Sequence, residues 1–111
     1  MIKNKMRPIH PGEILKNEYL LPLKLSVNKL SMLLHISAPR LNDIVRERRG
    51  ISSDTALRLA RFFNTSAQFW LNLQTSYDLK QTEIKIGDSI HDEVKPIQQM
   101  TGDKQTLSMH L

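Results

Sequence analysis

Apolar residues recur at helical spacing through the first part of the chain, most clearly in a pair of short helices. The spacing predicts a helix over residues 27–34, with Ser26 as its N-cap and with Leu30 and Leu34 facing inward. His35 follows at a sharp turn, where a positive φ is often needed and where His is one of the few side chains that tolerate it. This segment therefore predicts a helix followed by a tight turn.

The second helix of the pair is expected to begin after Ser37, a second N-cap, with Pro39 in its first turn. Leu41 and Ile44 are spaced to face the core. We expect Gly50 to stop this helix. The spacing leaves a polar outer face made of Ala38, Pro39, Arg40, Asn42, Asp43 and Arg46.

Further helices are predicted on both sides of this pair. Pro11 and Glu13 suit the first turn of a helix that Pro22 should stop. Residues 65–68 match a capping box, with Thr followed three positions later by Gln. The helix predicted over residues 54–63 has an inner face of Ala56, Leu57, Ala60 and Phe63.

The pattern weakens beyond Tyr77. Ile84 and Ile86 alternate as in a short strand, whereas Ile90 and Val94 have helical spacing. From about residue 98 onward, the polar composition predicts disorder.

The charge is concentrated in the first half of the 111-residue chain. Residues 1–50 carry ten Lys and Arg against four Asp and Glu, whereas residues 51–111 carry six against seven. The basic half contains the helix pair, as expected of a surface that faces phosphates, although RNA or an acidic protein surface would be attracted as well. There is no cysteine, which fits a reducing cytosol, and neither a membrane span nor a secretory signal is predicted.

The outer face of the second helix has the side chains that read DNA. In the major groove Arg can form two hydrogen bonds with guanine and Asn two with adenine, which makes Arg40 and Asn42 candidate base contacts. Arg46, Arg48 and Arg49 follow, where they could bind phosphates. An ordinary helical hairpin with a solvated polar face is the alternative that these residues alone leave open.

The residues do not predict an enzyme. The four histidines, His10, His35, His91 and His110, are scattered, and the chain has neither a Gly-rich phosphate loop nor a nucleophile elbow. We therefore expect no catalytic site, no cofactor and no metal site.

Five of the six aromatic residues lie within residues 62–77. Most should close the core over the helix pair, but a domain this small cannot easily hide all of them. We therefore expect a dimer face drawn from Phe69, Trp70, Leu73 and Tyr77.

Several stretches carry a family likeness: RPIHPGEIL at residues 7–15, RGIS at 49–52, DTALRLA at 54–60, and FWLNLQ at 69–74 with YDL at 77–79. Together they resemble the HigA family of antitoxins, within the Cro/phage-repressor (XRE) type of helix-turn-helix. The resemblance implies an all-α fold with a five-helix, lambda-repressor-like domain over residues 10–79. Residues 1–9 would form a flexible basic arm, and residues 80–111 a partly disordered C-terminal extension.

The resemblance also implies a function. The protein would be a cytoplasmic homodimer that neutralises a HigB-like toxin, a small mRNA-cleaving ribonuclease, and represses its own operon at a palindromic operator. The implied DNA contacts lie on two helices: Ser37, Ala38, Pro39 and Arg40, with Asn42 and Asp43 beyond, and Ser26, Asn28 and Lys29 on the preceding helix.

The chain departs from the family pattern at Ser31, where Ala is usual, and at His35, where Gly is usual. The Ser31 hydroxyl can form a hydrogen bond back to a helix carbonyl. Two other interpretations stay open: a stand-alone transcriptional regulator without a toxin partner, and an interaction module whose helix-turn-helix no longer binds DNA.

Overall fold

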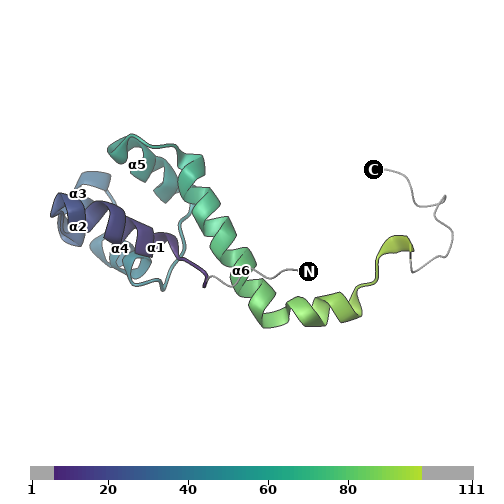
Figure 1. Cartoon of the computed structure of the whole chain (residues 1–111). Helices are drawn as coiled ribbons and strands as arrows, with labels where there is room; N and C mark the ends of the chain where they lie inside the picture. The colour runs from purple at the N-terminus through teal and green to yellow at the C-terminus, as the bar shows by residue number, and fades with distance from the viewer. Residues whose placement is uncertain (1–6, 99–111) are drawn as a thin grey trace. The chain divides into compact units, whose positions relative to one another are not determined.

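The computed structural model describes residues 7–98, and in that range the chain is helical, with no strand (Figure 1). The elements are α1 (Pro11–Ile14), η1 (Leu15–Leu20), α2 (Leu21–Leu23), α3 (Val27–Leu34), α4 (Ala38–Val45), α5 (Ser53–Phe63) and α6 (Ala67–Glu93). The first three form one continuous run, which gives five helical segments between residues 11 and 93 and confirms the predicted all-α class.

The chain divides into two compact units at residues 81 and 82. The first unit contains α1 to α5 and the part of α6 up to Gln81. Residues 79 and 80, where the sequence predicts the end of the helix-turn-helix domain, lie inside α6. The first six residues of the predicted basic arm, and the region from residue 99 onward that we expect to be disordered, lie outside the described residues.

The strand expected around Ile84 and Ile86 is wrong, because both residues belong to α6. Their alternation is only two residues long. It is outweighed by helical hydrogen bonding that propagates from Ala67 with no proline to interrupt it before Pro96.

Pro22 does not stop the first helix, which continues to Leu23 and ends at Lys24 in the left-handed conformation, with a φ of 54°. The preceding turns are π-helical, and the N–H of Leu21 donates to the carbonyl of Lys16, five residues back. The wider turn changes which carbonyls face the proline ring and its missing N–H, so Pro22 fits inside the helix, which ends one residue later.

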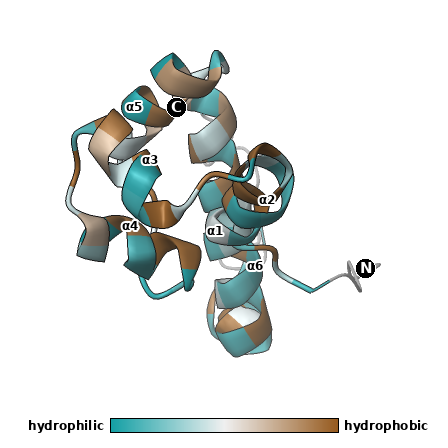
Figure 2. Ribbon diagram, turned by 90° about the vertical axis from the view of Figure 1, so that its left-hand side faces the viewer, coloured by the Kyte–Doolittle hydropathy of each residue, from teal (hydrophilic) through white to brown (hydrophobic). Residues whose placement is uncertain are grey.

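The core lies between the helices of the first unit, and Figure 2 shows that these helices mix apolar and polar residues along their length. Trp70 is fully buried, and its indole N–H donates to Thr65 Oγ1 over 2.9 Å. The other buried apolar residues are Leu15, Leu20, Leu30, Leu34, Leu41, Ile44, Ile51, Ala56 and Leu59.

Two predictions about local packing are wrong. Leu57, expected on the inner face of α5, is 64% exposed, because Ala56 and Leu59 occupy the buried face instead. The predicted capping box does not form, because α6 begins at Ala67 and its N-cap is therefore Ser66, while the Thr65 hydroxyl accepts from the indole of Trp70. The Ser66 hydroxyl accepts the hydrogen bond from the N–H of Phe69 in its place.

None of the helices in residues 7–98 is both long and apolar enough to cross a membrane.

Candidate nucleic-acid interface

The two helices predicted from the sequence form a helix-turn-helix. Ser26 caps α3 by accepting from the N–H of Lys29 over 3.0 Å. His35 ends the helix in the left-handed conformation, with a φ of 60° and a ψ of 43°, and the N–H of Ile36 donates to the carbonyl of Ser31. This is the hydrogen-bond pattern of a Schellman-type helix end, so the turn predicted at His35 is confirmed.

Ser31 uses its hydroxyl as the sequence predicts. It is 3% exposed, and its Oγ donates to the carbonyl of Asn28 over 2.7 Å. The buried hydroxyl therefore has a partner inside its own helix, and it needs none from the core.

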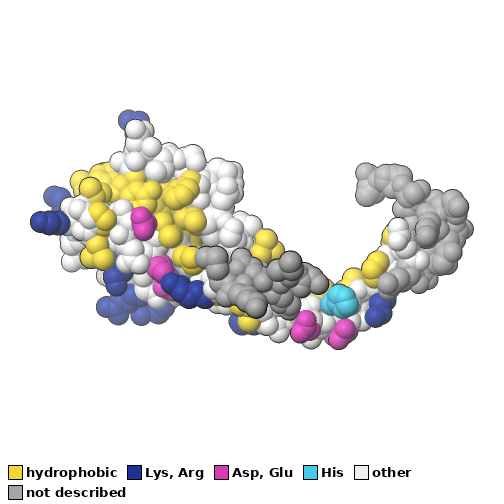
Figure 3. All heavy atoms as spheres, viewed as in Figure 1, with side chains coloured by type: hydrophobic (Ala, Val, Ile, Leu, Met, Phe, Trp, Pro, Cys, Tyr) yellow, Lys and Arg dark blue, Asp and Glu magenta, His cyan; other side chains and the backbone are white. Residues whose placement is uncertain are grey.

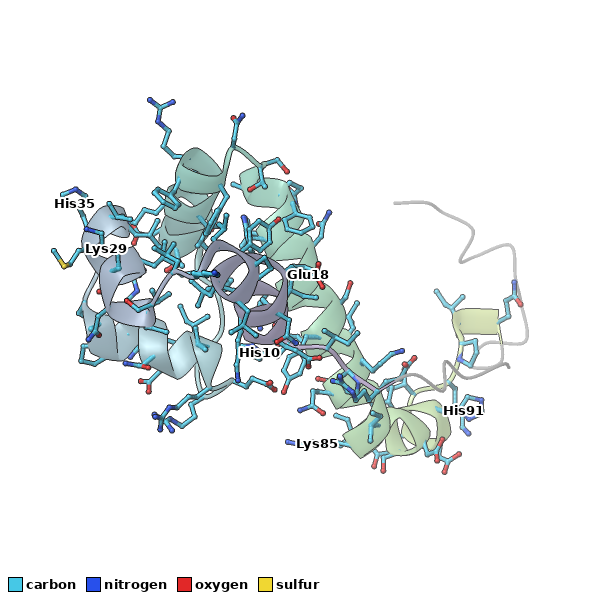
Figure 4. The ribbon with its side chains drawn as sticks, turned by 60° about the vertical axis from the view of Figure 1, so that its left-hand side comes forward. His10, Glu18, Lys29, His35, Lys85 and His91 are labelled. Carbon is cyan, nitrogen blue, oxygen red and sulfur yellow. The ribbon has the colours of Figure 1, made fainter. Side chains whose placement is uncertain are left out.

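Helix α4 presents the expected polar face. Ser37 caps it, Pro39 lies in its first turn, and Leu41 and Ile44 are fully buried. Of the predicted site residues around this helix, Ser37, Pro39, Arg46, Arg48 and Arg49 are exposed, whereas Ala38, Arg40, Asn42 and Asp43 are half-buried. At the preceding helix, Ser26, Asn28 and Lys29 are exposed, and Figure 4 shows Lys29 on α3 and His35 at its end.

The guanidinium of Arg40, the predicted guanine contact, is held by the first turn of α5. It donates to Asp54 over 2.7 Å, to the hydroxyl of Ser52 over 3.4 Å and to the hydroxyl of Thr55. The hydrogen bond from Arg40, together with hydrogen bonds from Arg58 on α5, keeps the pKa of the Asp54 carboxyl below its usual range. In this arrangement Arg40 joins α4 to α5.

Arg58 is a further link that the sequence pattern gave no reason to select. It pairs with Asp54 on its own helix at 3.1 Å, and it donates to the carbonyls of Leu34 and His35 over 2.9 and 3.3 Å. A guanidinium can satisfy carbonyls that a helix end leaves free. Asp54 therefore pairs with both Arg58, which contacts the turn after α3, and Arg40, which belongs to α4. Through these contacts the turn is joined to α4.

The segment after α4 carries three arginines. Helix α4 itself does not end where the sequence predicts. The helix stops at Val45, and Glu47, not Gly50, has the left-handed backbone, with a φ of 65°. The N–H of Arg48 donates to the carbonyl of Asp43 over 2.8 Å, which closes the helix end early. Figure 3 shows Lys and Arg side chains gathered at the edge of the first unit near α4.

Asp43 is the acidic partner of this arginine segment. Its carboxylate accepts from Arg48 at 2.9 Å and lies 4.0 Å from Arg49. All three side chains are at least one-third exposed, so these ion pairs are open to exchange with solvent or with another anion.

The four residues expected in a dimer face are not all available. Trp70 is fully buried within the single chain, because it fills the space between α6 and the first helix beside Tyr19 and Phe63, so its assignment to a surface is wrong. Leu73 and Tyr77 are half-buried, and Phe69 is 37% exposed.

Some other exposed apolar side chains of the first unit lie on α3 and α5. Leu33, Leu57 and Phe62 are each at least 40% exposed, and they line one groove with Asp54 and Arg61. The sequence pattern placed Leu57 inside and therefore missed this groove.

The described part of the predicted arm is anchored at its end. Arg7 donates to both carboxylate oxygens of Glu13, over 2.8 and 2.6 Å, and the Arg7 hydrogen bond keeps the pKa of Glu13 below its usual value.

Comparisons with known proteins agree with this geometry. A helix-turn-helix family model (HTH_3) matches residues 17–70. The chain is 60% identical to virulence-associated protein I of Dichelobacter nodosus over 81 residues, which is 73% of this chain and 75% of that protein.

Two solved structures share the fold and contain DNA. The antitoxin HigA of Pseudomonas aeruginosa with the higBA promoter has a TM-score of 0.81 and 53% identity, and the match covers 82% of this chain and 99% of that one. Antitoxin GraA in complex with its operator has a TM-score of 0.81 and 45% identity, covering 87% and 98% of the two chains.

Proposed function

Because the chain belongs to the HigA family of helix-turn-helix antitoxins, we propose that it is the antitoxin of a toxin–antitoxin module and represses its own operon. It neutralises a HigB-like, mRNA-cleaving toxin and binds double-stranded operator DNA. The observation that carries the proposal is the polar face of α4, presented beside an exposed segment with three arginines, in a fold shared with two antitoxins solved with promoter or operator DNA.

Helix α4 is the proposed recognition helix. The exposed Pro39 and the small Ala38 at its N-terminus let the backbone approach the floor of the major groove, and Asn42 can pair with adenine. For Arg40 to pair with guanine, its guanidinium has to exchange the carboxylate of Asp54 for the base edge. The ion pair is exposed on the Asp54 side, which makes this exchange feasible.

The phosphate contacts come from two places. Ser26, Asn28 and Lys29 lie in or beside the first turn of α3, where a helix N-terminus also favours an anion. Arg46, Arg48 and Arg49 follow α4. Asp43 is the remaining member of the proposed site, and it pairs with Arg48 in the free protein.

We further propose a homodimer, because one recognition helix reads only a few base pairs. Two copies related by a two-fold axis place two α4 helices on half-sites roughly 34 Å, or a multiple of that, apart. The surface proposed from the sequence is reduced to Phe69 with the half-buried Leu73 and Tyr77, since Trp70 belongs to the core.

In this proposal residues 10–79 form the DNA-binding domain, residues 1–9 a basic arm and residues 80–111 an extension of it. The site of action is the cytoplasm, where a bacterial operator and an mRNA-cleaving toxin are both found.

The test of the antitoxin is co-expression with the neighbouring small open reading frame. We expect that frame to be toxic alone, to be rescued by this chain and to co-purify with it. If nothing is toxic and nothing co-purifies, while an operator is still bound, the alternative of a stand-alone XRE-type regulator replaces the proposal.

The test of DNA binding is a footprint on the chain's own promoter, followed by affinity measurements at several salt concentrations. Replacing Arg49 with Ala should weaken binding to all DNA, since it removes a phosphate contact. The control is Arg61→Ala, which removes the same charge from an exposed position on α5 outside the proposed interface. Equal losses in the two variants would mean that only net charge matters and that the Arg49 contact is absent.

A further inference from the structure

Two motifs that carry the family likeness contain no proposed DNA contact: HPGE at residues 10–13 and FWLNLQ at residues 69–74. They are far apart in sequence, one at the start of α1 and one in α6. Each contributes one polar side chain, His10 or Gln74, that reaches the segment between α4 and α5. The segment they share is residues 46–51, which we call the arginine loop because it carries Arg46, Arg48 and Arg49.

His10 approaches the arginine loop from α1. It is 3% exposed, and its Nδ1 accepts from the N–H of Gly12 over 2.9 Å, so it caps the helix. The ring lies edge-on to Tyr77 at 4.8 Å, and the nearby backbone of Arg49 acts to raise its pKa. Figure 4 shows His10 at the start of this helix.

The hydrogen bond from Gly12 defines the protonation of His10. Because Nδ1 accepts from Gly12, it carries no proton, and the single proton of the neutral ring lies on Nε2, where it can donate to a backbone carbonyl. Burial lowers the pKa of His10, opposed by the nearby charges of Glu47 and Asp78 and by the backbone of Arg49. The neutral ring thus caps α1 and lies beside the backbone of the arginine loop.

Gln74 approaches the other end of the arginine loop from α6. Its Oε1 accepts from the N–H of Ile51 over 2.7 Å, and its Nε2 donates to Asp78 over 3.0 Å. Asp78 therefore fixes which end of the amide faces the loop. Gly50 lies so close that a Cβ there would sit 2.9 Å from the Gln74 carboxamide, so the loop backbone packs directly on this side chain.

The loop between these two contacts has no regular secondary structure of its own. Its start is closed by the N–H of Arg48 donating to Asp43, and Ile51 at its end is buried in the core. The side chains of Arg48 and Arg49 lie 2.9 and 4.0 Å from the half-buried carboxylate of Asp43.

We propose that His10 and Gln74 are positioning residues for DNA binding, which hold the arginine loop from two sides and set where Arg48 and Arg49 meet the phosphate backbone. This inference rests on the proposed DNA-binding function and goes beyond it, because neither residue contacts DNA. A loop held in its binding geometry loses less conformational entropy when its arginines engage phosphates.

The test compares Gln74→Ala with Gln68→Ala in the full-length chain. Gln68 lies on the same helix and bonds only Asn72, at an exposed position, so it controls for the loss of a glutamine from α6. Operator affinity is measured over a range of salt concentrations, and folding is checked by circular dichroism and thermal unfolding. We expect Gln74→Ala to weaken operator binding about tenfold. The salt slope, which is the steepness with which the logarithm of the binding constant falls with the logarithm of the salt concentration, should decrease by about one to two, since each phosphate contact contributes about 0.9 to it.

His10→Asn tests the other contact. Asn accepts from the same N–H as a helix cap, so the cap of α1 is kept, but its side chain is too short to bridge to Arg49. We expect a folded protein whose salt slope falls as in Gln74→Ala. A variant that loses thermal stability but keeps the wild-type slope would show a purely structural role and overturn the inference.

The amide of Ile51 gives a readout in the wild-type protein that does not depend on any variant folding. Because Gln74 accepts its hydrogen bond, we expect this amide to be protected from hydrogen exchange, both free and bound to DNA. Exchange at the rate of an open loop would overturn the inference. If the wild-type chain binds no operator, the proposed function fails and the inference with it, whereas binding with unchanged slopes in the variants overturns the inference alone.

Discussion

Gly12→Ala tests the packing of α1 against the recognition helix. A Cβ at this position would overlap the carbonyl oxygen of Ile44 and lie 2.8 Å from its carbonyl carbon, where ordinary contact begins at 3.4 Å. It would also lie 3.1 Å from Nδ1 of His10. The obstacle is the backbone of the last turn of α4, so the two helices have to move apart.

We expect the substitution to lower the free energy of unfolding by about 3 kcal/mol, the upper part of the range for overpacked sites. At about 4–8 °C per kcal/mol for a domain of this size, that is a fall in Tm of roughly 12 °C or more. Helix propensity acts in the opposite direction, because Ala is favoured over Gly by up to about 1 kcal/mol. The steric effect is larger, so the net change is a loss.

The assay is thermal and urea unfolding of the full chain, with Gly87→Ala as the matched control. A Cβ at Gly87, inside α6, would meet only the Glu83 side chain at 3.5 Å or more. The same substitution there should therefore raise stability by about 0.5–1 kcal/mol through propensity alone. If Gly12→Ala proved as stable as the wild type or more so, the close approach of α1 to Ile44 would be refuted.

Four further outcomes are expected. Arg40→Ala should weaken operator binding by about 1–3 kcal/mol and relax one base position, and an equal loss on random DNA would make it a phosphate contact instead. Arg48→Ala should lower the salt slope by about one, and an unchanged slope removes it from the interface. Trp70→Ala should destabilise the fold by about 3–5 kcal/mol as measured by urea unfolding, because the side chain is fully buried; a variant as stable as the wild type would contradict this. The pKa of His10 is lowered in the folded state, so the unfolded chain binds a proton first as the pH falls below about 6.5. The free energy of unfolding should therefore decrease below that pH, and it should decrease less in His10→Asn. Identical pH profiles of unfolding in the two proteins would contradict this prediction.

Local features were predictable because their causes lie within a few residues. The caps at Ser26 and Ser37, the left-handed turn at His35 and the back-bond of Ser31 each depend on side chains within one helical turn. Where local signals competed, the pattern alone could not choose. Pro22 lies inside a helix because of the π-helical turns before it, and Ser66 caps α6 in place of Thr65.

For the candidate site, the sequence identified which residues could contact DNA but not how they are held. Arg40 is a plausible base contact from its position on α4, yet its partner Asp54 comes from the next helix. Burial was also undetermined: Trp70 was expected at a surface and is buried, and Leu57 was expected inside and is exposed. A helical period gives the angle between residues on one helix, but it does not give the direction from which the next helix approaches.

The sequence by itself determined most of the helices, the turn between α3 and α4 and the basic half, because these follow from spacing, caps and charge along the chain. The likeness to the family was carried by its motifs. Only the tertiary structure decided that Asp54 pairs with Arg40 and that Gly12 packs against the backbone of Ile44. It also decided that His10 and Gln74 lie beside the arginine loop. These contacts join residues more than ten positions apart. They depend on how whole helices pack. Many side chains contribute to the free energy of that packing, so no single local pattern predicts it.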